Sequence, residues 1–185
     1  MSYTSAIEWT ESTWNPVTGC MQVSPGCDHC YALKFAERFR GVPGHPYESG
    51  FEITLRPARL DLPVRWRDPR LIFVNSMSDL FHVNVPNTFI ERVFTTMTTA
   101  HWHTFQVLTK RPQRAVRMAH TLPWPCNVWL GTSVEAAQYL WRVDALRRVP
   151  AAIRFLSCEP LLGSLQDLDL TGIGWVMVRR APRRG

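Results

Sequence analysis

Short apolar runs alternate with amphipathic segments from residue 71 to the end of the chain. Five of these runs are rich in Val, Ile, Leu, Phe or Trp and too short for ordinary helices, so they predict buried strands. The runs are Leu71 to Asn75, Thr104 to Thr109, Asn127 to Thr132, Ile153 to Ser157, and Ile173 to Val178.

Helix-period segments separate the apolar runs. Three sets of apolar residues each fall on one helical face. The sets are Phe89, Ile90, Val93, Phe94 and Met97, then Ala115, Val116 and Ala119, then Ala137, Leu140 and Trp141. Pro86 and Pro112 suit the first turn of a helix, and Ser133 suits an N-cap. Because strands joined by crossover helices lie parallel, the pattern predicts an α/β fold with a parallel sheet, either a barrel or an open sheet.

The first third of the chain predicts one more helix and one more strand. Ala32, Phe35, Ala36 and Phe39 follow the i, i+3, i+4, i+7 rule, which predicts a helix that ends around Gly41. The run from Phe51 to Leu55 is a further candidate strand. The expected total is therefore about six strands.

Polar residues follow most of the predicted strands. In parallel α/β folds the carboxyl ends of the strands form the ligand-binding face, although each such residue taken alone also suits a turn or a cap. The candidates for ligand contacts are Ser76, Asp79, Lys110, Thr132, Ser133, Glu135, Ser157 and Glu159.

Composition and charge favour one soluble domain. The chain has 185 residues, of which 45% are hydrophobic, with no apolar run of about 20 residues and no signal peptide, so we expect a cytoplasmic protein without membrane contact. The net charge is +6, but Arg179, Arg180, Arg183 and Arg184 supply four of these charges and leave +2 for the rest. We therefore expect a domain over residues 1–178 and a disordered basic tail over residues 179–185, with only weak support for a nucleic-acid partner.

Cys20, Cys27 and Cys30 form the most specific motif, with the spacing C-x6-C-x2-C. In a reducing compartment such spacing favours a metal site over disulfides. Three thiolates suit an iron–sulfur cluster that keeps one iron free, whereas structural zinc takes four protein ligands. Neighbouring glycines and the start of a helix at Tyr31 suit an anionic cluster, because both allow backbone amides to approach it.

Two alternatives remain for the cysteine motif: a zinc site that recruits His29 or Cys158 as a fourth ligand, and a loop without any ligand. Free cysteines are often buried, so Cys158 is expected to be a small core residue, and Cys126 to be inert. His101 and His103 have no third ligand nearby in the sequence and are expected to be surface or packing residues.

Several strings together resemble a phage-associated family of radical S-adenosylmethionine-like proteins. Besides the three-cysteine loop, they are Gly26 to Ala32, Leu108 to Pro112, Leu130 to Glu135, and Ser157 to Leu162. They occur in the same order over nearly the whole chain, up to about Val178.

This resemblance implies a partial parallel (β/α) barrel that holds a 4Fe-4S cluster through Cys20, Cys27 and Cys30. The fourth iron would bind S-adenosylmethionine, and the eight strand-end residues named above would contact this cofactor. Reductive cleavage of the cofactor would yield a 5′-deoxyadenosyl radical that abstracts hydrogen from an unknown substrate, with electrons from an unidentified donor. His29 takes the position that an aromatic residue or histidine holds in the wider superfamily.

The chain departs from the family pattern at two places. The wider superfamily separates the first two cysteines by three residues, whereas six separate Cys20 from Cys27, so the loop must bulge. Similar proteins continue past Val178 into a Gly-Gly-Glu turn and further helices, which predicts that this copy is truncated or frameshifted and its barrel incomplete. The alternative function is a non-catalytic, zinc-stabilised module that binds nucleic acid through the arginine-rich tail.

Overall fold

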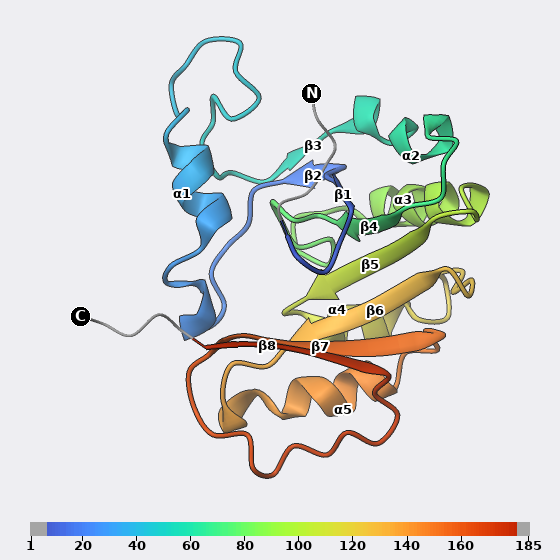
Figure 1. The fold of residues 1–185 in the computed structure, drawn as a ribbon. Coiled ribbons are helices and arrows are strands. Elements are labelled where there is room, and N and C mark those ends of the chain that lie inside the picture. Colours follow the sequence, from blue (N-terminus) through green and yellow to red (C-terminus); the bar gives the residue numbers. More distant parts are fainter. Residues whose placement is uncertain (1–6, 181–185) are drawn as a thin grey trace.

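A six-stranded sheet organises the chain in the computed structural model, which describes residues 7–180 (Figure 1). All five strand pairings are parallel, in the order β1-β4-β5-β6-β7-β8. The strands are β1 Ser12–Trp14, β4 Leu71–Val74, β5 Thr104–Thr109, β6 Val128–Ser133, β7 Ile153–Leu161 and β8 Trp175–Arg180. A small antiparallel pair, β2 Val17–Thr18 with β3 Thr54–Leu55, lies apart from this sheet. The architecture is α/β and consistent with a partial (β/α) barrel.

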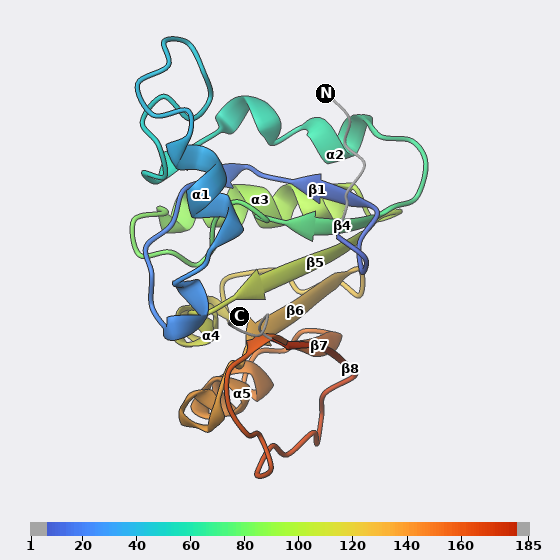
Figure 2. The same ribbon diagram turned by 60° about the vertical axis from the view of Figure 1, so that its left-hand side comes forward.

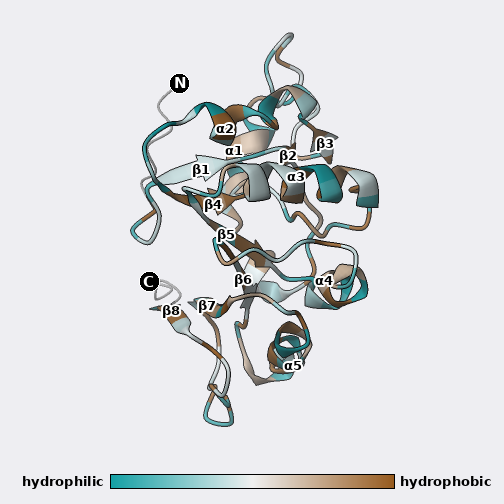
Figure 3. Ribbon diagram, turned by 90° about the vertical axis from the view of Figure 1, so that its right-hand side faces the viewer, coloured by the Kyte–Doolittle hydropathy of each residue, from teal (hydrophilic) through white to brown (hydrophobic). Residues whose placement is uncertain are grey.

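Helices cover one face of the sheet (Figures 1 and 3). The covering helices are α3 Asn87–Thr99, α4 Pro112–Met118 and α5 Trp141–Arg147. The other helical elements are α1 Tyr31–Glu37, α2 Leu62–Arg65 and the 3-10 turns η1 Pro25–Cys27, η2 Pro57–Arg59 and η3 Ala137–Tyr139. Side chains such as Val107 and Leu130 share one core with Phe94 and Leu146, and all four are fully buried. In Figure 3 the hydrophobic colour is pronounced at β4, whose four residues are all apolar.

Aromatic rings gather on the opposite face of the sheet. Trp9 and Phe73 have ring centroids 4.6 Å apart, and Phe155 and Trp175 have theirs 5.7 Å apart. Gly131 on β6 pairs with Phe155 on β7, and a Cβ at Gly131 would lie 2.3 Å from the Phe155 ring. The glycine thus lets a large ring lie across a central strand.

The apolar runs beyond residue 71 become strands as predicted, but several predictions nearer the N-terminus were wrong. The candidate strand Phe51–Leu55 does not join the main sheet, and only Thr54–Leu55 within it forms a strand, in the small antiparallel pair. The sixth strand of the main sheet is Ser12–Trp14 instead. The helix predicted to end near Gly41 ends at Glu37 and continues as turns.

Helix starts were predicted with mixed success. Pro112 is the first residue of α4, as predicted, whereas Pro86 caps α3 and lies just outside it. The N-cap prediction for Ser133 was wrong, because Ser133 is the last residue of β6 and the next α-helix begins at Trp141. Its backbone is paired with Ser157 in the sheet, which excludes it from a helix start.

β8 is an edge strand of the described sheet, and Val178 on it is 63% exposed. The strand includes Arg179 and Arg180, the first two residues of the predicted tail. The other five tail residues lie outside the described part of the chain. None of the helices in residues 7–180 combines the length and the apolar character needed to cross a membrane.

Candidate functional site

The cysteine loop, residues 20–30, lies at the carboxyl ends of the parallel strands. Gly19, just before it, donates its N–H to the carbonyl of Met77 in the segment after β4. At its far end, the Tyr31 hydroxyl donates to the carbonyl of Ser76 at 2.5 Å. The 3-10 turn η1, within the loop, contacts β7, and Figure 2 shows it on the side of the sheet to which the arrow of β5 points. The loop therefore lies at the edge where parallel α/β folds bind ligands.

Cys20, Cys27 and Cys30 are free thiols and half-buried. No three His, Cys, Asp or Glu side chains within residues 7–180 form a group that would hold a metal ion, so the sulfurs do not make a closed cage by themselves. Three thiols on one loop are nevertheless the donor set of a cluster that keeps one iron open. The chemistry of the donors thus fits a cluster with an open iron better than a four-ligand structural zinc site.

A first set of contacts joins the start of the loop to the ends of β4 and β5. The Arg111 guanidinium donates to Asp79 Oδ2 at 2.9 Å, to Cys20 Sγ at 3.6 Å and to the carbonyl of Met21 at 2.9 Å. Asp79 also accepts bonds from the Thr109 hydroxyl and from the backbone N–H groups of residues 81 and 110. With two bonds to each oxygen, this carboxylate is saturated by the protein.

A second set of contacts centres on Glu135, which is fully buried two residues after β6. Its Oε1 lies 3.2 Å from Lys110 Nζ and accepts a bond of 2.7 Å from the hydroxyl of Ser24, and its Oε2 accepts a bond of 2.8 Å from Arg142. A Cβ at Gly26 would lie 2.5 Å from the Glu135 side chain. The carboxylate therefore packs directly against the cysteine loop.

These surroundings shift the pKa values of two groups in opposite directions. Burial, followed by the nearby charge of Asp79, raises the pKa of the Cys20 thiol to about 11, although Arg111 acts in the other direction. Burial alone would raise the pKa of Glu135, but the charges of Lys110 and Arg142 and the Ser24 hydrogen bond hold it below its ordinary value. Glu135 is therefore an ion at neutral pH, whereas Cys20 must lose a proton to bind a metal.

The eight predicted cofactor contacts all lie at this edge of the sheet. Sheet register places Thr109 beside Thr132, and Ser133 beside Ser157. Several side chains already have internal partners: Thr132 donates to the carbonyl of Thr109, the Ser76 hydroxyl bonds to Asn15, and Ser157 lies 3.5 Å from a carboxylate oxygen of Glu159. Asp79 and Glu135 are the two whose oxygens are most fully occupied, so their contribution to a site is to hold other groups in place.

Asn75 was missed as a candidate, although it lies in the polar segment after β4. It is 2% exposed and adopts a left-handed conformation, with φ of 61°. Its Oδ1 accepts the N–H of Val17 at 3.3 Å, but its Nδ2 has no hydrogen-bond partner among the described residues. A buried donor without a partner beside a polar edge is a candidate ligand contact. Asparagine at a strand end is itself the sequence signal, because it tolerates positive φ.

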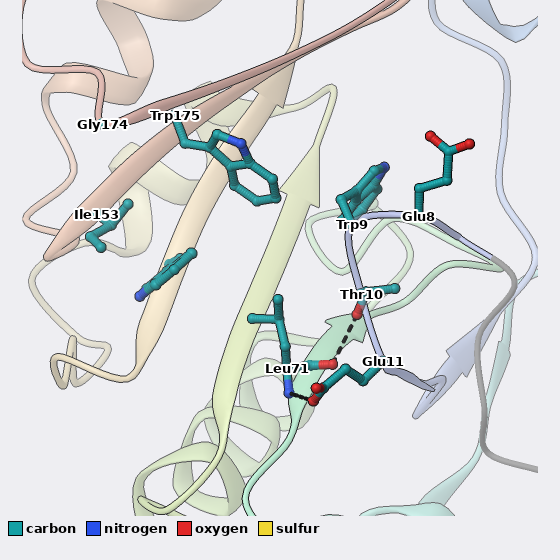
Figure 4. A pocket seen from close by; sticks show the side chains of 9 residues that line it. Glu8, Trp9, Thr10, Glu11, Leu71, Ile153, Gly174 and Trp175 are labelled. Carbon is teal, nitrogen blue, oxygen red and sulfur yellow. Dashed lines mark hydrogen bonds between the residues drawn. The ribbon is translucent and has the colours of Figure 1, made fainter.

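Two cavities of similar size lie at opposite ends of the sheet. The cavity of about 550 Å³ beside Cys20 and Met21 also meets Leu33, Phe51 and Asn84. The other, of about 540 Å³, lies at the amino ends of the strands, where Trp9, Trp129 and Trp175 line it together with Leu71 and Ile153 (Figure 4). Only the first touches a cysteine of the loop, so we take that cavity as part of the candidate site.

The structure also places the two cysteines outside the loop and the histidines considered above. Cys158 is 1% exposed in the core, as predicted, and Cys126 is exposed. His103 is buried and bonded to the backbone of Pro63 and Arg70, which confirms a packing role. His29, the other fourth ligand considered for zinc, is exposed.

The fold and the site together define an α/β protein with a parallel sheet and a three-cysteine loop at its carboxyl edge. Residues 4–179 match the family described as "Protein of unknown function (DUF5131)", so the chain belongs to this family. None of the curated proteins matches the sequence.

One solved structure shares the fold. It is a spore photoproduct lyase variant with bound AdoMet and dinucleoside spore photoproduct, 13% identical in sequence, with a TM-score of 0.64. The match covers 97% of this chain but 59% of the lyase chain, so the protein spans about three fifths of that structure. At this identity the likeness concerns the fold.

Proposed function

We propose that the protein binds a 4Fe-4S cluster through Cys20, Cys27 and Cys30 and uses it with S-adenosylmethionine in radical chemistry. The observation that carries this proposal is the position of three free thiols on one loop at the carboxyl edge of a parallel sheet. A related fold holds AdoMet in the lyase structure, which supports the choice of cofactor. When bound, the cluster and its cofactor would supply a 5′-deoxyadenosyl radical for hydrogen abstraction.

The residues of this chain would bind and orient the cluster and its cofactor and shield them from solvent. The cysteine thiols would lose their protons to the solvent as they bind iron, and the raised pKa of Cys20 makes this step the more demanding for that thiol. Asn75, Ser76, Lys110 and Glu159 lie on the same edge and would offer hydrogen bonds to the cofactor. The predicted contacts Ser133 and Ser157 are buried neighbours in the sheet and would lie beside it, whereas Thr132 shares the face of Leu130, which packs in the core.

Anaerobic iron and sulfide analysis tests the proposal. We expect about four irons and four sulfides per wild-type chain, and a brown protein solution that absorbs visible light. Cys27→Ala should lose the cluster, whereas Cys126→Ala, which changes an exposed cysteine outside the loop, should keep it. The loaded protein, reduced with dithionite, should then convert S-adenosylmethionine to 5′-deoxyadenosine. A colourless protein that retains stoichiometric zinc would refute the proposal and favour the zinc-stabilised module.

A further inference from the structure

Lys110 and Arg111 are consecutive in the sequence but act on two different parts of the cysteine loop. Arg111 contacts Cys20 and Met21 near the start of the loop. Lys110 pairs with Glu135, whose carboxylate receives the Ser24 hydroxyl from the middle of the loop. The turn after β5 therefore supplies a cation to each of two sets of contacts that hold the loop. We call them the Arg111 clamp, in which Arg111 joins Asp79 to Cys20 and Met21, and the Glu135 clamp, in which Glu135 joins Lys110 and Arg142 to Ser24.

Both clamps rest on buried groups that cannot easily rearrange. Asp79 is 5% exposed and holds the Arg111 guanidinium in a fixed direction through a bond of 2.9 Å. Glu135 is fully buried and Arg142, its second cation, is 1% exposed. The carboxylate oxygens of Asp79 and Glu135 are satisfied by these contacts, and low local polarity strengthens each bond, while Arg142 Nε has no partner among the described residues.

We propose that Arg111 and Glu135 are positioning residues, which hold the cysteine loop at the strand ends before it takes up a cluster. The proposal rests on the proposed function above. Arg111 would in addition place a hydrogen-bond donor and a positive charge beside the sulfur of Cys20, and this raises the reduction potential of the cluster. Outer contacts of this kind orient metal ligands and tune the metal.

Hydrogen exchange of the metal-free full-length protein tests the positioning role without any cluster. The backbone N–H groups of Cys27, Asp28 and Cys30 are hydrogen-bonded within the loop, so its peptides should be protected. We expect faster exchange over residues 20–30 in Arg111→Met and in Ser24→Ala, which removes one clamp contact without burying a new charge. Arg147→Met is the matched control, because Arg147 pairs with Asp144 and Asp169 on exposed surface.

A redox titration of the reconstituted protein, followed by electron paramagnetic resonance, tests the second part. Arg111→Met should lower the reduction potential relative to wild type and Arg147→Met, and should weaken iron retention about 10- to 100-fold. Arg111→Lys should restore part of the potential, because it keeps the charge, but less of the loop protection, because it lacks the planar fork.

The outcomes separate this inference from the proposed function. A wild-type protein that takes up no cluster refutes the proposed function and the redox part, while hydrogen exchange still decides the positioning role. A cluster that forms with the same potential and retention in Arg111→Met leaves the proposed function intact and overturns the role of Arg111. Unchanged loop exchange in both Arg111→Met and Ser24→Ala overturns the positioning role itself.

Discussion

Breaking the buried ion pair between Glu135 and Arg142 by single substitutions should cost more in sum than replacing both partners together. Their side chains are 0% and 2% exposed, and the oxygen and nitrogen lie 2.8 Å apart. Removal of one member of such a pair costs about 3–5 kcal/mol, because the other charge stays buried without compensation. We therefore expect Glu135→Gln to lose about 3 kcal/mol, a large part of a total stability of roughly 5–15 kcal/mol.

Arg142→Met should cost less, about 2 kcal/mol, because Lys110 still neutralises Glu135. The double variant should lie within about 2 kcal/mol of wild type, since apolar or neutral groups of similar volume often replace a buried pair without large loss. The two single losses, about 5 kcal/mol together, should then exceed the double loss by at least about 3 kcal/mol. This coupling is the quantity that the structure predicts.

Urea unfolding of all four proteins measures the coupling. A loss of 3 kcal/mol should lower the unfolding midpoint by about 1–2 M urea at an unchanged m-value. The exposed pair of Arg147 with Asp144 serves as the control cycle and should show a coupling below about 1 kcal/mol. Additive losses at Glu135 and Arg142, with a coupling below about 0.5 kcal/mol, would refute the reasoning.

Two further predictions concern the rest of the fold. Gly131→Ala should lower the free energy of unfolding in urea by about 1–3 kcal/mol, because the new methyl group meets the buried ring of Phe155. Gly174→Ala is the control and should cost less, because its Cβ would make ordinary contacts. Equal losses in the two variants would contradict this. Burial lowers the pKa of both His82 and His103. As the pH falls below about 6.5, both histidines take up protons more readily in the unfolded chain than in the folded protein. The free energy of unfolding should therefore drop, by at most about 2.7 kcal/mol per pH unit for the two histidines together. Equal free energies of unfolding at pH 7.5 and 5.5 would be evidence against this prediction.

The hydrophobic pattern predicts the strands that are continuous apolar runs, and it gives the bounds best for a central strand. Thr104–Thr109 has the predicted bounds, because both faces of this central strand are covered and the run is apolar almost throughout. Ser12–Trp14 escaped prediction, because it has three residues and only one large apolar side chain. Phe51–Leu55 has strand-like composition, yet pairing with Val17–Thr18 leaves it outside the main sheet.

The sequence also predicts which polar residues share the carboxyl edge, since parallel strands end together. It does not predict their partners. The bond from Ser24 to Glu135 joins residues 111 positions apart, and that from Arg111 to Met21 joins residues 90 apart. Such contacts depend on where a loop crosses the sheet. Local periodicity carries no information about this crossing.

The long spacing between the first two cysteines has a geometric reason in this crossing. The loop begins after β2 at Gly19, which bridges to Ser78 in the segment after β4, and must bring Ser24 to Glu135 beyond β6, two strands away from β4. Two strand spacings amount to about 10 Å, and five residues reach at most about 17 Å. A loop with three residues fewer between Gly19 and Ser24 would leave two residues and about 7 Å of backbone, less than the two strand spacings. The six-residue spacing therefore lets one loop contact both the Arg111 clamp and the Glu135 clamp.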